Sequence, residues 1–225
     1  MIPWKLIDTA QIPDNGGELQ LHQRNTEFSI SIVGGGVLMS TRAHGSEDAL
    51  AEVACSEISG RSPARVLIGG LGMGFTLAAA LHQLEPDAEV VVAELVPAVV
   101  KWNRDYLGEH AGHPLQDKRT SVCEDDVAKT IKAEQQAYDA ILLDVDNGPE
   151  GLTHKKNNWL YSVEGLQASY AALRSKGLLA VWSAGPDRKF TARLRQVGFK
   201  VEQVKVRERD NKGGHHTIWL ARRGS

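Results

Sequence analysis

A glycine-rich segment between two different hydrophobic patterns is the first part of the sequence that could do chemistry. It contains Gly70, Gly72 and Gly74, which follow an apolar run at 65–69 and open a run with helical spacing at 74–84. Glycine lets the backbone approach a ligand closely, and the first turn of a helix presents unpaired N–H groups. The segment predicts a ligand-binding turn between a strand and a helix, and a plain β–α connection is the alternative.

A single acid ends the next apolar run. Glu94 follows Gly70 by 24 positions, as in nucleotide-binding folds where an acid pairs with ribose hydroxyls. The glycine spacing is tighter than the dinucleotide pattern G-x-G-x-x-G, and no pyrophosphate cradle extends into the helix. We therefore expect the glycine turn and Glu94 to enclose an adenosine moiety. A solvated residue at the strand end is the alternative for Glu94.

Two further pairs of acids follow apolar runs. Asp125 and Asp126 come after 120–123, where a carboxylate can accept a hydrogen bond from an adenine amino group or cap a helix. Asp144 and Asp146 come at the end of a central run, where open α/β sheets bind ligands. Closely spaced acids have perturbed pKa values and can accept a proton from an attacking amine. A simple turn is the alternative for Asp146, which precedes Asn-Gly-Pro.

The elements that must position these residues alternate along the chain. Ser46 is expected to cap a helix that extends through Ser59. Strands are then predicted at 65–69, 89–94, 120–123, 140–144 and 178–183, and helices at 74–84, 97–107, 126–136, 159–175 and 187–197. The strands are nearly continuous apolar runs, which indicates a parallel sheet with helices on both faces. Two late runs, 200–206 and 216–221, predict an antiparallel hairpin at the sheet edge.

The first 45 residues have a different pattern. Turn signals separate short runs at 18–24, 27–33 and 37–40, and the middle run alternates apolar and serine residues as a half-buried strand does. We expect an antiparallel β extension at 1–45 and a Rossmann-like domain at 46–225. The predicted fold class is α/β, with a mostly parallel sheet.

Composition excludes several classes of protein. Of the 225 residues, 42% are hydrophobic and 24% are charged, and the formal net charge is −2, so we expect no nucleic-acid and no membrane partner. Cys55 and Cys123 lie in no CxxC or Cys/His spacing, and the histidines lie in no metal spacing. We expect no metal site and no disulfide framework. Because the first ten residues are not a signal peptide, a cytoplasmic location is expected.

These motifs together resemble the spermidine synthase branch of the class I S-adenosylmethionine-dependent methyltransferase superfamily, over about residues 37–221. The resemblance rests on the segments VLIGGLGMG, VVAELVPAVV, CEDDV and YDAILLDVDNGPEG. It implies that Glu94 holds the ribose, that Asp125 or Asp126 meets the adenine, and that Asp144 helps to deprotonate an acceptor amine. It also implies a homodimer.

The sequence departs from the family pattern in the parts that choose the substrates. The family loop GGGDGG carries an aspartate beside the amine of decarboxylated S-adenosylmethionine, and Gly72 stands there in this chain. An aspartate would repel the carboxylate of intact S-adenosylmethionine, whereas glycine leaves room for it. A Tyr-His pair is missing at 44–50, Met39 replaces a gate glutamine, and the acid motif is one residue short at Asp146.

Three functions are compatible with these residues. We expect methyl transfer from S-adenosylmethionine to a small amine-bearing acceptor, with aminopropyl transfer from decarboxylated S-adenosylmethionine as the alternative. A non-catalytic sensor of adenosyl ligands is a third hypothesis. Positioning alone can supply much of the rate for displacement at a sulfonium carbon, so no metal is required. We place Glu47, Tyr161 and Trp182 on the acceptor side of the site. For Tyr161 and Trp182, packing in the core is the alternative.

Overall fold

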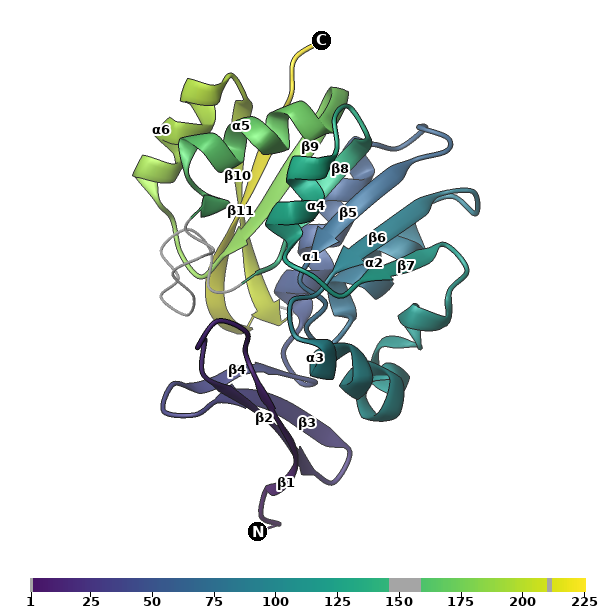
Figure 1. Ribbon diagram of the computed structural model, residues 1–225, viewed down its shortest axis with the longest axis vertical. Helices are drawn as coiled ribbons and strands as arrows, with labels where there is room; N and C mark the ends of the chain where they lie inside the picture. The colour runs from purple at the N-terminus through teal and green to yellow at the C-terminus, as the bar shows by residue number, and fades with distance from the viewer. Residues whose placement is uncertain (1, 146–158, 210–211) are drawn as a thin grey trace.

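The computed structural model describes residues 2–145, 159–209 and 212–225, which form two β-sheets and the helices around the larger one (Figure 1). Asp146, which we predicted to assist Asp144, lies outside the described residues. The smaller sheet comes from the N-terminal part of the chain, and the larger sheet comes from everything after it. This arrangement is the α/β architecture with a β extension that the sequence predicts.

The smaller sheet is antiparallel, and its strands follow the order of the chain. The strands are β1 (Lys5–Gln11), β2 (Glu18–Arg24), β3 (Glu27–Ile32) and β4 (Gly36–Ser40). The sequence did not predict β1, because a register shift between Leu6 and Asp8 interrupts the alternation that marks a strand. Leu21 and Ile30 on one face are almost fully buried, so this sheet shares the core of the larger domain.

The larger sheet has seven strands in the order β10-β11-β9-β8-β5-β6-β7. They are β5 (Arg65–Gly69), β6 (Glu89–Ala93), β7 (Thr120–Cys123), β8 (Tyr138–Leu143), β9 (Leu173–Ser183), β10 (Lys200–Arg209) and β11 (Lys212–Arg222). The strands from β5 to β9 are parallel, and β10 and β11 form the predicted antiparallel hairpin. β9 begins earlier than predicted, because the polar residues 174–176 interrupt its apolar run while Leu173 already pairs with β8.

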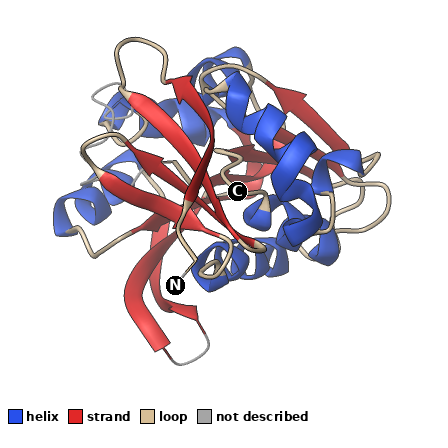
Figure 2. Cartoon of the chain, turned by 90° about the horizontal axis from the view of Figure 1, so that it is seen from below, coloured by secondary structure: helices blue, strands red, loops and turns tan. Residues whose placement is uncertain are grey.

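Helices cover both faces of the larger sheet (Figure 2). They are α1 (Gly45–Glu57), α2 (Phe75–Gln83), α3 (Pro97–Trp102), α4 (Val127–Ala133), α5 (Val163–Ala172) and α6 (Arg188–Val197). Alternate residues of β5 enter two separate cores: Val66 and Ile68 pack with the first three helices, whereas Leu67 packs with the last three. A strand buried on both faces must be apolar throughout, which is the pattern in the sequence.

Two helix predictions are wrong in detail. Ser46 does not cap α1: the N-cap residue is His44, and the Ser46 hydroxyl donates to the Glu47 carboxylate instead. The helix predicted at 97–107 changes at Asn103 into a π-helical turn, Asn103–Leu107. Short 3-10 turns follow at Gly108–Ala111 and Pro114–Gln116. The Asn103 side-chain amide donates to the Val99 carbonyl oxygen at 2.9 Å and to the Gly72 carbonyl oxygen at 2.8 Å, which ties this turn to the glycine loop.

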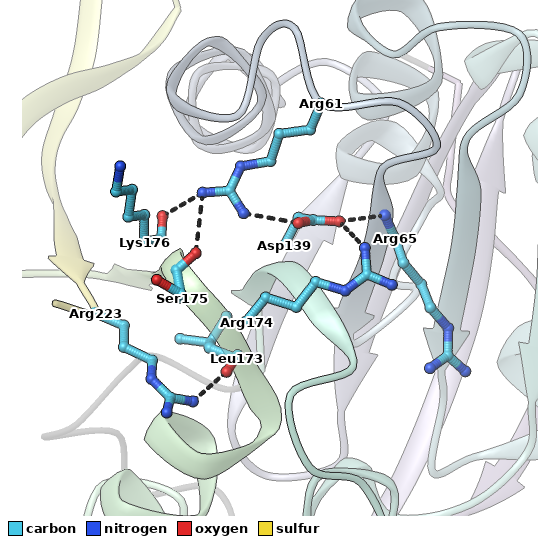
Figure 3. A network of polar contacts seen from close by, with 8 residues as sticks. All are labelled: Arg61, Arg65, Asp139, Leu173, Arg174, Ser175, Lys176 and Arg223. Carbon is cyan, nitrogen blue, oxygen red and sulfur yellow. Dashed lines mark hydrogen bonds and ion pairs between the residues drawn. The ribbon is translucent and has the colours of Figure 1, made fainter. Parts of the chain in front are cut away.

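A buried carboxylate fastens the end of the sheet at which β8 begins (Figure 3). Asp139 accepts hydrogen bonds from the Arg61 and Arg174 guanidinium groups at 2.7 Å each, and from the Arg65 backbone N–H at 2.9 Å. Arg61 also donates to the carbonyl oxygens of Ser175 and Lys176. Charge-assisted bonds of this kind are stronger than neutral ones, so the network holds the α1–β5 loop against β8 and β9.

Candidate active site

A cavity of about 450 Å³ lies between the N-terminal sheet and the carboxyl ends of β5, β6, β8 and β9. Its volume is in the range of pockets that hold small molecules. One wall comes from the smaller sheet, including Ile30 and Met39, and the opposite wall contains the glycine turn after β5. Ligands of open α/β sheets bind at this end of the strands, so the cavity is where the fold predicts a site.

The glycine turn contains residues with positive φ angles, a backbone conformation that favours glycine. Gly70 has a φ of 90° and Gly74, the N-cap residue of α2, has a φ of 87°. A Cβ at Gly70 would overlap the Asp144 carbonyl oxygen, so the missing side chain lets the ends of β5 and β8 lie close together. A Cβ at Gly72 would lie 3.3 Å from Met39 Sδ, which places the smaller sheet directly over the turn.

The Glu94 carboxylate binds the backbone of the glycine turn. Its carboxylate accepts hydrogen bonds from the backbone N–H groups of Leu71 and Val96 at 2.9 Å each, and the residue is 8% exposed. Burial raises the pKa of Glu94, and the backbone hydrogen bonds oppose that effect. Glu94 is therefore not a solvated residue at the strand end. Glu94 also lines the cavity at the carboxyl end of β6.

Asp144 comes directly after β8 and lines the cavity. Its Oδ2 accepts a hydrogen bond from the Thr76 hydroxyl at 2.7 Å. Burial and, to a smaller extent, the nearby charge of Glu47 raise the pKa of Asp144 to about 7, and the Thr76 hydroxyl acts in the opposite direction. Glu47, in the first turn of α1, lines the same cavity, and burial also raises its pKa. Acids with perturbed pKa values in a cavity are candidates for proton transfer.

The two acids predicted to meet adenine occupy different positions. Asp126 is the N-cap residue of α4, where its side chain accepts from the Ala128 backbone N–H at 2.8 Å, and it also lines the cavity. The capping interpretation is therefore confirmed. Asp125 pairs with Lys129 at 2.7 Å and is not among the lining residues. The geometry favours Asp126 for the adenine contact, which stays a prediction.

The two aromatic residues also differ. Trp182, at the end of β9, lines the cavity and stacks on the His216 ring with 4.7 Å between the ring centroids. Tyr161 is buried in the core on the other face, packs against the Phe190 ring, and donates its hydroxyl to the Val145 carbonyl oxygen at 3.1 Å. It is not among the lining residues, so the structure gives it the core position that was the alternative.

The charged side chains that line this cavity are acidic. Carboxylates of Glu47, Glu94, Asp126 and Asp144 line it, and the described lining residues include no lysine or arginine. Such a surface favours a cationic ligand. In the described part of the chain no group of three or more His, Cys, Asp or Glu side chains could hold a metal ion. None of the helices described there is long and apolar enough to cross a membrane.

Sequence reasoning missed Thr76 and the contact between Met39 and the glycine turn. A hydroxyl in the first turn of α2 is visible in the sequence, but its partner depends on β5 lying beside β8, and 68 positions separate Thr76 from Asp144. Met39 was identified only as a departure from the family pattern. Its contact depends on how the smaller sheet packs on the larger domain.

The fold is shared with solved spermidine synthase structures. A spermidine synthase from Thermotoga maritima matches with a TM-score of 0.77 at 18% identity, over 98% of this chain and 73% of that chain. A spermidine synthase in complex with the transition state analogue AdoDATO matches with a TM-score of 0.76 at 19% identity, over the same shares. The chain therefore has the fold of these spermidine synthase structures.

Comparison of the sequence with family models gives the narrower assignment. Residues 43–190 match the spermine/spermidine synthase domain, and the chain belongs to that family. The polyamine aminopropyltransferase of Saccharolobus solfataricus is 29% identical over 127 residues, which are 56% of this chain and 41% of that protein. The polyamine aminopropyltransferase of Prochlorococcus marinus is 29% identical over 141 residues, 62% and 47% of the two chains. The matched regions thus span less than half of the length of these relatives.

Proposed function

We propose that this protein transfers an aminopropyl group from decarboxylated S-adenosylmethionine to a small amine. Family membership and the names of the curated relatives support this reaction more than the methyl transfer that Gly72 led us to expect. The observation that carries the proposal is the charge of the cavity, in which several carboxylates and no described lysine or arginine face the ligand. Both the decarboxylated donor and an amine acceptor are cations without a carboxylate.

The surroundings of Gly72 support the same donor. The carboxylate of intact S-adenosylmethionine would need a cationic or hydrogen-bonding partner, because an unpaired charge is costly away from water. Met39 stands over Gly72, and Leu71 and Ile30 are among the apolar residues that line the cavity. The ammonium group of the decarboxylated donor can pair with the carboxylates of the cavity, whereas a carboxylate would find no lysine or arginine among the described lining residues.

The residues of the site then have distinct tasks. Gly70, Gly72 and Gly74 shape the wall against the donor, Glu94 binds the ribose hydroxyls, and Asp126 meets the adenine. Asp144 takes the proton of the attacking amine, and Asp146 was predicted to assist it. The protein works mainly by aligning the amine nitrogen with the carbon and sulfur of the donor. This alignment can remove a large part of the entropic contribution to the activation barrier.

The roles of the residues on the acceptor side are also predictions. Glu47 and Trp182 line the cavity and are proposed to contact the acceptor, whereas Tyr161 would act only through the Val145 carbonyl that it holds. A homodimer is also a prediction.

Methyl transfer from intact S-adenosylmethionine is the second candidate. It is favoured by Gly72, because the family's aspartate is missing at the position that would repel a carboxylate. Calorimetry with both donors separates the two reactions, and tighter binding of the decarboxylated form is expected. Incubation of each donor with a panel of amines must then give products heavier by one aminopropyl group with the decarboxylated donor. Products heavier by one methyl group would replace the first proposal with the second.

A non-catalytic sensor is the remaining alternative. Asp144→Asn distinguishes it, because an enzyme loses turnover while it retains donor binding. A wild-type protein that binds the donor but modifies no amine in the panel would support the sensor.

A further inference from the structure

Two helices from distant parts of the sequence each place a side chain that acts on Asp144, one through a hydrogen bond and one through its charge. Thr76 in the first turn of α2 donates a hydrogen bond to Asp144 Oδ2 at 2.7 Å. Glu47 in the first turn of α1 faces the same cavity with a negative charge. Thr76 is 2% exposed, and its hydroxyl is the one side-chain donor that the described residues offer to this carboxylate.

We propose that Thr76 and Glu47 are positioning residues that act through Asp144: the hydroxyl stabilises its ionised form, and the Glu47 carboxylate opposes ionisation and attracts the cationic acceptor. The proposal rests on the proposed function, because it assumes that Asp144 accepts the proton of the amine. It assigns roles to two side chains that come from different helices.

The proton transfer balances as follows for an acceptor that enters as an ammonium ion. One N–H bond breaks, and the proton goes to a carboxylate oxygen of Asp144. The nitrogen lone pair forms a bond to the donor carbon while the carbon–sulfur bond breaks and leaves its electron pair on sulfur. The base must be ionised to accept the proton, and it must bind protons more tightly than an ordinary aspartate to compete for them.

Thr76 meets the first requirement. A hydroxyl donor on a carboxylate oxygen favours the charged form, since the hydrogen bond is stronger to an anion than to a neutral acid. The Gly74 N-cap, with its φ of 87°, starts α2 so that residue 76 lies within reach of the end of β8.

Glu47 meets the second requirement. A like charge nearby disfavours the charged form of its neighbour. The Ser46 hydroxyl holds the Glu47 carboxylate through a hydrogen bond of 2.5 Å, so the charge has a defined place. His44 pairs with Asp48 on the same turn at 2.7 Å. Glu94, Asp126 and His216 are the other titratable lining residues described.

The test follows the titration of the Asp144 carboxyl by ¹³C NMR in the protein without donor or acceptor, assigned with Asp144→Asn. Thr76→Val removes the hydroxyl and keeps the shape of the side chain, so the titration midpoint is expected to rise by about one pH unit. Glu47→Gln removes the charge, so the midpoint is expected to fall by about one unit. Thr76→Ser is expected to restore the wild-type midpoint, and Glu52→Gln, on an exposed position of α1, is expected to leave it unchanged.

Shifts in opposite directions from Thr76→Val and Glu47→Gln, with rescue by serine, would establish the proposal. Any other pattern would overturn it, including shifts of the same sign or no shift. Thr76→Ala provides the same measurement if the protein does not accommodate valine. Because the titration needs no turnover, opposite shifts in a protein that modifies no amine would refute the proposed function and still establish the effects of Thr76 and Glu47 on the ionisation of Asp144.

Discussion

At the scale of single residues, the raised pKa of Asp144 gives the molecule a measurable dependence on pH. The ordinary pKa of an aspartate in an unfolded chain is about 3.9, and the folded value is about 7. The folded protein therefore binds more protons than the unfolded chain between these values, so this residue makes the fold less stable as pH rises through that window.

Asp144→Asn is expected to remove this effect. Relative to wild type, the free energy of unfolding of the variant should increase between pH 4 and pH 7 by on the order of 3 kcal/mol. Denaturant unfolding of both proteins across this range measures the difference. Parallel stability curves would show that Asp144 titrates normally in the fold.

The same residue sets the expected pH profile of the proposed reaction. A base with a pKa of about 7 is ionised above that pH, so the rate should rise as pH passes through it and then level off. Asp144→Asn should lower turnover by about a hundredfold or more, with donor affinity unchanged. Initial rates and calorimetry on both proteins measure the two effects, and equal turnover would exclude the role of a base.

Gly70 has both a positive φ and a close contact at the position of a Cβ atom. The energetic costs of these two features can be measured separately. Gly60 has a similar φ of 83° but open space where its Cβ would lie. Gly60→Ala should cost about 1 kcal/mol of unfolding free energy for the backbone conformation alone. Gly70→Ala should cost more and weaken donor binding, because its methyl group would collide with the Asp144 carbonyl. Similar losses in both variants would mean that the turn can move away.

At the scale of elements, the parallel strands could be predicted because both of their faces are buried. β5 and β7 have the predicted ends: β5 is a buried, mostly apolar run between two layers of helices, whereas β7 is a short, partly exposed edge strand. β1 could not be found, because its bulge shifts the alternation. The π-helical turn at Asn103–Leu107 is also invisible in the helical periodicity.

The network around Asp139 makes a prediction about how the elements are joined. Asp139→Ala leaves two guanidinium groups and the Arg65 N–H without their acceptor, so unfolding free energy should fall by about 2–4 kcal/mol. Glu57→Gln weakens the exposed pair with Arg222 and should cost less than about 1 kcal/mol. Chemical denaturation of both variants gives the comparison, and equal small losses would show that the network does not fasten the sheet.

At the scale of the whole molecule, the sequence predicted both sheets and most of one side of the cavity. Gly70, Glu94 and Asp144 follow strand ends, and strand ends of a parallel sheet meet at one edge. The other wall could not be predicted, because nothing local indicates that Met39 and Ile30 would face the glycine turn. Tyr161 shows a related limit of prediction from sequence. It is close in sequence to predicted site residues, but the fold does not place it in the cavity.

A donor bound between the two sheets would stabilise both together. At a concentration one hundred times its Kd, decarboxylated S-adenosylmethionine should add about 2.7 kcal/mol to the free energy of unfolding. Hydrogen exchange should slow in β3 and β4 as well as in the glycine turn, since both sheets line the cavity. Protection confined to the larger sheet would mean that the smaller one is not part of the binding site.

The placement of the N-terminal sheet also has a consequence for synthesis on the ribosome. Its apolar side chains Leu19, Leu21, Phe28 and Ile30 belong to a core whose other members lie at positions as late as Leu220. The ribosome synthesises the N-terminal sheet before the strands and helices that cover it. The nascent chain therefore exposes an apolar surface during most of its elongation. Chaperone capture of stalled chains should be strongest before β8 and β9 emerge, and it should decline once the central strands are available.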